Sequence, residues 1–207
     1  FGVYNLLHKI TLERLGLKDR VRVWSPSDEN YFAGVPAGLS IMLVVAFATS
    51  DILLNALYDV RPVEKEAGAA MKIYEHYRLQ IIEKIREAGA GDLSMSAAML
   101  QVANGSLFGT ASILKEAASA FSAVKGSEEI PTVAVVGEIY VRCDPFANDF
   151  TIDKLEKRGI RAHFAPFNEW LEYVDHMNRY NGDATGVNAQ LTTLVQRRIQ
   201  VRTYQLF

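Results

Sequence analysis

The sequence predicts an α/β fold, with a Rossmann-like three-layer unit on a parallel sheet and a helical segment that joins it to a partial second α/β unit. Two observations predict it. Residues 130–137 form a short, β-branched apolar run, typical of a strand buried on both faces of a parallel sheet. A helix pattern and a second strand pattern at residues 160–165 follow, and strand, helix, strand is a βαβ unit. We therefore expect residues 1–125 to hold the partial unit and the helical region, and residues 126–207 the Rossmann-like βαβ domain.

The composition is close to that of an average soluble protein and excludes several functional classes. Lys and Arg number 22 against 24 Asp and Glu, whereas nucleic-acid-binding domains usually carry a basic excess. The 49% hydrophobic content excludes a disordered chain, and one cysteine excludes a disulfide scaffold. No secretory signal pattern opens the sequence, so we expect a cytoplasmic location.

The beginning of the chain predicts a helix and then a strand. Several apolar residues between Tyr4 and Leu15 share one helical face, and Gly16 is a natural end for this helix. Residues 20–24 alternate polar and apolar side chains, which is typical of a half-exposed strand.

The stretch between Glu29 and Asp51 has no charged residue and is the one segment to compare with a membrane span. A spanning helix needs ~20 predominantly apolar residues. Here about 15 follow one another, and proline, glycine and serine interrupt them early. We therefore expect a buried helix rather than a membrane contact, ending near Arg61 because Pro62 disfavours helical geometry before it.

Four more helices are predicted from the spacing of apolar residues. An amphipathic pattern covers residues 63–88, and an alanine-rich pattern covers residues 94–124 with an interruption at Asn104-Gly105. Further helices are expected over residues 168–180 and in the tail at residues 189–207.

The connections of the βαβ unit carry turn and capping residues. Asn148 or Asp149 can cap the helix between the two strands, which runs through Arg158 and ends at Gly159. Residues 181–186 have the composition of a loop.

The segment from Gly137 to Asn148 is the candidate binding loop, because ligands of open α/β sheets bind where a strand ends and the next helix begins. It is neither a dinucleotide fingerprint nor a phosphate loop. Glu138 and Arg142 can pair with each other or engage a ligand, and Tyr140 can stack or donate a hydrogen bond. The alternative is that these residues only fix the loop.

Cys143 is the only cysteine and permits two interpretations. Beside Arg142 and near a helix N-terminus it can have a lowered pKa and act as a thiolate nucleophile or ligand; otherwise it is an incidental thiol. A single cysteine cannot hold an iron–sulfur cluster. The histidines show no metal-site spacing, so no metal ligand is predicted among His8, His76, His163 and His176.

Two motifs closely resemble those of the large CoA-substrate-specific enzyme activases. One is Gly-Glu-Ile-Tyr-Val-Arg at residues 137–142, followed by Asn148. The other is Pro-Phe-Asn-Glu-Trp-Leu at residues 166–171, and it contains the second set of candidate site residues: Asn168, Glu169 and Trp170.

Two weaker matches extend the resemblance over most of the chain. Residues 1–5, Phe-Gly-Val-Tyr-Asn, resemble the stretch that follows a cysteine motif in that family, and Arg-Pro-Val-Glu at residues 61–64 resembles its Arg-Pro-Tyr-Glu segment, with Val63 in place of tyrosine.

The resemblance implies a role in anaerobic metabolism. Such proteins join ATPase-type activator modules to a region related to the subunits of 2-hydroxyacyl-CoA dehydratase and benzoyl-CoA reductase, and they use ATP and a [4Fe–4S] cluster to deliver low-potential electrons. This chain has neither the phosphate motif nor the cluster cysteines. We therefore expect the dehydratase-like portion of a longer protein, without a cofactor of its own, inactive alone, and partnered by the other domains of that protein. The alternative is a non-catalytic Rossmann-like module that binds acyl-CoA or docks a partner domain.

Overall fold

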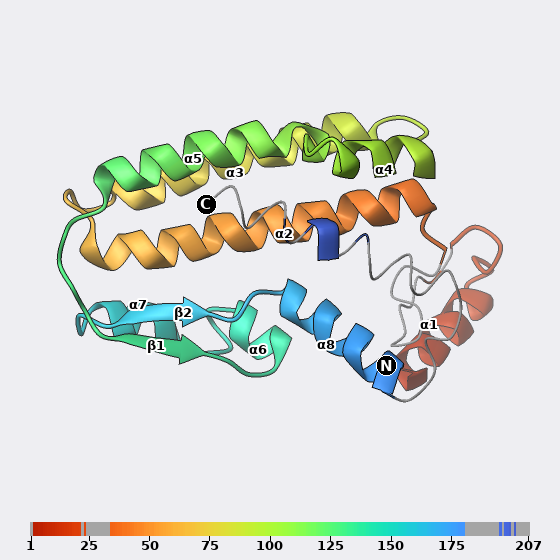
Figure 1. Ribbon diagram of the computed structural model, residues 1–207. Helices are drawn as coiled ribbons and strands as arrows, with labels where there is room; N and C mark the ends of the chain where they lie inside the picture. The colour runs from red at the N-terminus through yellow and green to blue at the C-terminus, as the bar shows by residue number, and fades with distance from the viewer. Residues whose placement is uncertain are drawn as a thin grey trace. The chain divides into compact units, whose positions relative to one another are not determined.

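The computed structural model describes residues 2–21, 23, 34–180, 195, 197–199 and 201, and it is mostly helical with one parallel pair of strands (Figure 1). Contacts divide the chain into two units, Phe1–Pro36 and Ala37–Phe207. The boundary expected at residue 126 falls inside the second unit, within which the helical region packs directly on the strands.

The first unit contains the predicted N-terminal helix, α1 (Gly2–Arg14). It ends where Gly16 adopts a φ of +67° and the Leu17 N–H bonds back to the carbonyl of Leu12 at 2.8 Å. The prediction of a strand at residues 20–24 is wrong for the residues of this segment that the structure describes. The N–H groups of Arg20 and Val21 return to the Leu17 carbonyl in a turn, while Arg22 and Trp24 lie outside the described residues.

The helical region of the second unit confirms the predicted order of helices. The small residues Asn104 and Gly105 interrupt the alanine-rich pattern as expected, and Gly105 takes a φ of +78°. The elements are α2 (Ala37–Val60), the 3₁₀ turn η1 (Arg61–Val63), α3 (Ala69–Gly89), α4 (Met95–Ala103), the 3₁₀ turn η2 (Leu107–Gly109) and α5 (Thr110–Val124).

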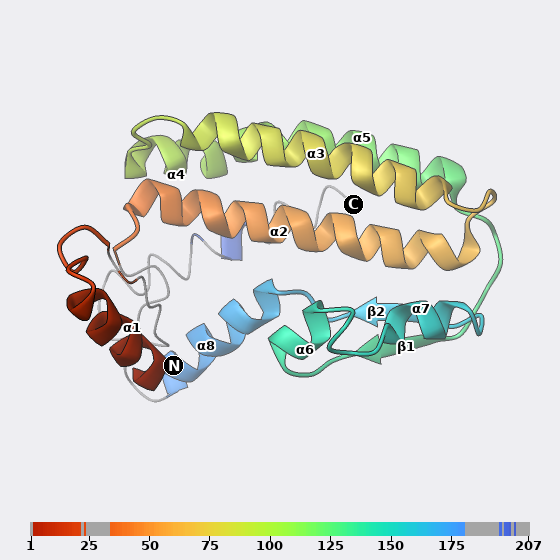
Figure 2. The same ribbon diagram turned by 180° about the vertical axis from the view of Figure 1, so that it is seen from behind.

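Helix α2 is the core helix of this unit. It packs on α3, α4 and α5 along one side and on the second strand along the other, as both views show (Figures 1 and 2). Leu53 and Leu57 of α2 share a buried apolar cluster with Leu114 and Phe121 of α5. The helix is long and apolar enough to cross a membrane, a test that core helices of soluble proteins also pass. Its contacts on both sides support the interpretation as a buried helix.

The predicted βαβ unit is present. Strands β1 (Thr132–Val135) and β2 (Arg161–Phe164) pair in parallel, and the helices around them are α6 (Ile139–Cys143), α7 (Thr151–Glu156) and α8 (Asn168–Tyr180). Ala162 and Phe164 of β2 form a small core with Ile152 of α7, and Leu54 and Tyr58 of α2 pack against it.

Two predictions for this region are wrong, and a third is confirmed only in part. Strand β1 is not buried on both faces. Thr132 and Ala134 are exposed because they lie on the face opposite Ala162, α2 and α7. Val133 lies on the same face as Ala162 and is still 39% exposed. Among the described residues the sheet has two strands, so the α/β pattern is confirmed, and the three layers of a Rossmann-like unit stay a prediction. The segment expected to be a loop contains helix α6.

The C-terminal predictions are tested only in part. Helix α8 agrees with the helix predicted over residues 168–180. The loop predicted at residues 181–186 and most of the predicted tail helix lie outside the described residues, while residues 195, 197–199 and 201 are helical.

Candidate functional site

The two family-like motifs line one open pocket of about 410 Å³. The pocket lies where β1 and β2 end, at Val135 and Phe164, because its lining comes from the segments that follow these strands. This is the edge of a parallel sheet at which ligands bind in α/β proteins. The lining residues are Val136, Gly137, Glu138, Ile139, Arg142, Glu169, Trp170 and Tyr173.

Short helix α6 positions one side of the pocket. Glu138 is its N-cap, and the Glu138 carboxylate accepts a hydrogen bond from the Val141 N–H at 2.9 Å. Before it, Gly137 has a φ of +141°, a conformation that favours glycine. Of the two predicted alternatives, a pair of Glu138 with Arg142 or contact with a ligand, the pair does not occur among the described ion pairs, where Arg142 lies against Glu169. The Glu138 carboxylate caps α6, because the N–H groups at the start of a helix lack partners within it.

Asn148 joins α6 to α7. Its Nδ2 donates to the carbonyls of Arg142 at 2.9 Å and Val141 at 3.2 Å, and its Oδ1 accepts from the Thr151 N–H at 3.2 Å. The N-cap of α7 is Phe150, not the predicted Asn148 or Asp149. Asn148 accepts from the N–H of Thr151, the first residue of α7, although it lies two residues before this N-cap. Asn148 does not line the pocket; it holds the segment that carries Arg142.

Arg142 is the central charged group of the site. Only 8% of the residue is exposed. Its Nη1 lies 3.5 Å from a carboxylate oxygen of Glu169, its Nη2 donates to the Pro166 carbonyl at 3.4 Å, and its guanidinium lies 5.8 Å from the ring centroid of Phe164. The Nε is buried and has no hydrogen-bond partner among the described residues.

Asp51 supports the other side of the pocket, and sequence reasoning did not identify it as a functional residue. Its carboxylate accepts from the N–H groups of Phe167 and Asn168, both at 2.9 Å, and from Nδ2 of Asn168 at 2.8 Å. Burial raises the pKa of Asp51, and these hydrogen bonds and the Arg142 charge oppose that shift. The available signal was a lone carboxylate in the middle of an apolar helix, which needs buried partners.

The remaining candidate residues separate into pocket and non-pocket groups. Glu169 and Trp170 line the pocket, whereas Asn168 is buried behind it as a partner of Asp51. Tyr140 is 68% exposed and is not part of the lining.

Cys143 does not have the lowered pKa that a thiolate role requires. It is the last residue of α6, at the wrong end of the helix for stabilisation by the dipole. Partial burial raises the pKa of the Cys143 thiol, although the Arg142 charge acts in the opposite direction. The interpretation as an incidental thiol is therefore favoured.

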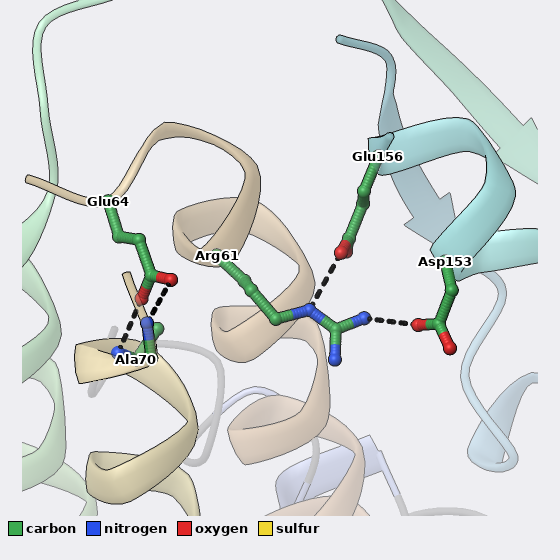
Figure 3. Close-up of polar contacts among 6 residues, drawn as sticks. Arg61, Glu64, Ala70, Asp153 and Glu156 are labelled. Atoms are coloured by element: carbon green, nitrogen blue, oxygen red, sulfur yellow. Dashed lines mark hydrogen bonds and ion pairs between the residues drawn. The ribbon is translucent and has the colours of Figure 1, made fainter. Parts of the chain in front are cut away.

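The Arg-Pro-Val-Glu segment does not line the pocket. Its two charged side chains, Arg61 and Glu64, connect neighbouring helices (Figure 3). Arg61 Nε donates to Glu156 at 2.7 Å and its Nη2 donates to Asp153 at 3.0 Å, which connects η1, directly after α2, to α7. Glu64 accepts from the N–H groups of Gly68 at 2.6 Å and Ala70 at 2.7 Å, at the start of α3.

No cluster of three metal-ligating side chains occurs among the described residues. The [4Fe–4S] cluster that the resemblance implies for the parent protein needs several thiolates. This chain offers one cysteine, with a raised pKa, so its residues do not fit such a cluster.

Comparisons with known proteins leave the family open: no family model, curated protein or solved structure matches this chain.

Proposed function

We propose that this chain is the dehydratase- and reductase-like region of a CoA-substrate-specific enzyme activase, and that it serves ATP-driven, low-potential electron transfer to 2-hydroxyacyl-CoA dehydratase-type chemistry. In this proposal it is a cytoplasmic binding and docking region and does not turn over alone. One observation carries the proposal: the two most specific motifs of the resemblance, far apart in the sequence, line the same pocket at the ends of β1 and β2.

The exposed side of the sheet supports a place within a larger Rossmann-like three-layer unit. Parallel sheets are normally covered on both faces. Thr132, Ala134 and His163 lie on the face opposite α2 and α7 and are exposed. Other domains of the parent protein are the partners that we propose for this face.

The proposal is tested in the longer protein, prepared without oxygen, by measuring ATP-dependent electron delivery to a 2-hydroxyacyl-CoA dehydratase. We expect Arg142→Ala to lower the rate at least about 10-fold, because a buried guanidinium at the pocket is removed. The matched control is Arg158→Ala, which removes an arginine on the exposed surface of the βαβ unit. Equal rates for both variants would refute a role for this pocket in electron transfer.

A second measurement concerns the 207-residue chain alone. We expect it to bind no stoichiometric iron and sulfide and to hydrolyse no ATP, because it has one cysteine and no phosphate loop. Turnover of ATP by this chain would contradict the assignment to the dehydratase-like region and would favour an ATPase module.

The alternative is a non-catalytic module that binds acyl-CoA through the same loop. It predicts saturable acyl-CoA binding to the isolated chain that Arg142→Ala weakens. Binding that is unchanged by this substitution would remove the pocket as an acyl-CoA site.

A further inference from the structure

Arg142 has more hydrogen-bonding capacity than its surroundings use. A guanidinium carries five N–H donors. The distances to Glu169 and Pro166 are 3.5 and 3.4 Å, and Nε has no partner among the described residues. Charge-assisted bonds of arginine to carboxylates are normally about 2.7–2.9 Å long. The guanidinium therefore loses little when it turns toward a better acceptor.

Glu169 is a weak and movable partner for this cation. Its side chain is 57% exposed, while the side chain of Arg142 is only 6% exposed. An exposed carboxylate at this distance contributes little and can move into solvent. Glu169 thus occupies a position that another carboxylate can take.

The walls of the pocket are mainly apolar. Val136 and Ile139 lie on the β1 side, and Trp170 and Tyr173 lie on the α8 side. Pockets of this size typically bury the apolar body of a small ligand and fix it with a few polar groups.

The carboxylates of Asp51 and Glu138 already accept hydrogen bonds from backbone N–H groups at the starts of the nearby helices, so these groups are not available to a phosphate. Phosphates usually bind free N–H groups at a helix N-terminus. Asp51 already accepts from the N–H groups of Phe167 and Asn168 at the start of α8, and Glu138 accepts from Val141 N–H in α6. One guanidinium, whose charge already acts on the buried carboxylate of Asp51 and which lies 3.5 Å from that of Glu169, suits a single negative charge better than a double one.

We propose that this pocket binds a monocarboxylate with an apolar body, whose carboxylate displaces Glu169 from Arg142 while its body lies between Ile139 and Trp170. This inference rests on the proposed function of the pocket as a binding site and names the class of its ligand. Planar carboxylates match the guanidinium fork, which a lysine cannot reproduce.

The test uses fluorescence of the full 207-residue chain. The chain has two tryptophans, so Trp24→Phe leaves Trp170 as the only one. The probes are cyclohexanecarboxylate, its neutral analogue cyclohexanecarboxamide and the dianion cyclohexyl phosphate. We expect saturable binding of the carboxylate, with the amide and the phosphate at least about 10-fold weaker. Equal or tighter binding of either analogue overturns the proposal.

Two substitutions in this background separate recognition from folding. Arg142→Lys is expected to weaken carboxylate binding at least about 10-fold, and Glu169→Gln to tighten it about 3- to 5-fold, because it removes a competing exposed charge. The control for Glu169 is Glu87→Gln, whose side chain is 56% exposed and pairs with Lys84. Because Glu169 is exposed, its variant folds even if Arg142→Lys does not. If Glu169→Gln binds the carboxylate more weakly than the parent chain does, the ligand does not displace Glu169 from Arg142.

Probe binding and electron delivery test the ligand class and the proposed function separately. If no probe binds while Arg142→Ala still impairs electron delivery in the longer protein, the ligand class is wrong and the functional role of the pocket stands. If the carboxylate binds as expected and electron delivery is unaffected, the pocket is a binding site outside electron transfer.

Discussion

At the scale of single residues, Asp51 connects α2 to the pocket by capping α8. Three donors, two of them buried and one partly buried, bond to its carboxylate, and Asp51→Ala leaves all of them without this acceptor. An unsatisfied buried donor costs about 1–3 kcal/mol. We expect the free energy of unfolding, measured in urea, to fall by about 3 kcal/mol. Asp92→Ala, on the surface, is the control and changes it by less than about 0.5 kcal/mol. Equal losses would contradict the capping role.

Tyr58 gives a second residue-scale prediction, on pH dependence. Burial raises the pKa of Tyr58 to about 12. The folded state therefore holds this proton above pH 10, where the unfolded phenol loses it, so the contribution to stability is complete below about pH 10 and is lost as the pH rises toward 12. The ultraviolet absorbance of the tyrosine phenolates follows the titration. Tyr58→Phe is expected to remove a phenolic transition near pH 12. If that transition persists in the variant, the burial of Tyr58 is wrong.

At the scale of elements, the start of α2 depends on a close contact at Gly38. A Cβ added at Gly38 lies 2.1 Å from the Leu93 carbonyl oxygen, which is backbone and cannot turn aside. We expect Gly38→Ala to lower the free energy of unfolding by about 2 kcal/mol. Gly91→Ala is the matched control, because a Cβ there meets nothing within 4 Å. A neutral Gly38→Ala would show that α2 and the segment before α4 are not in contact.

The elements also show what sequence patterns can and cannot predict. Helical period and turn residues predicted α2, α3, α5 and α8, since these depend on local order. The exposure of β1 was not predictable, because an apolar run does not reveal whether a second layer covers it. Helix α6 was missed because it is five residues long and depends on the Glu138 cap.

The sequence predicted the residues of the candidate site but not how they come together. The position of residues 137–148 after a strand marked one side of the pocket, and the resemblance marked Glu169 and Trp170. Their convergence was not predictable, because it depends on Asp51, which fixes the start of α8 from a distant point in the sequence.

At the scale of the whole second unit, Arg61 holds the helical region and the βαβ unit together (Figure 3). Its guanidinium also lies 5.4 Å from the ring centroid of Tyr58. Arg61→Met leaves Glu156, whose side chain is 11% exposed, without its cation. We expect a loss of about 2–3 kcal/mol in the free energy of unfolding. Arg86→Met, which breaks only an exposed pair with Glu83, is expected to cost less than about 1 kcal/mol. Equal losses in the free energy of unfolding for the two variants would show that Arg61 does not hold the helical region and the βαβ unit together.

Arg142 is proposed to receive a carboxylate in the pocket that the two motifs line, and this binding can be followed at the guanidinium itself. The most direct test is the nuclear magnetic resonance signal of the Arg142 Nε–H, assigned through its loss in Arg142→Lys. On addition of cyclohexanecarboxylate we expect this signal to shift with saturation, and to shift at lower ligand concentration in Glu169→Gln. A signal that stays in place at saturating carboxylate would contradict the account.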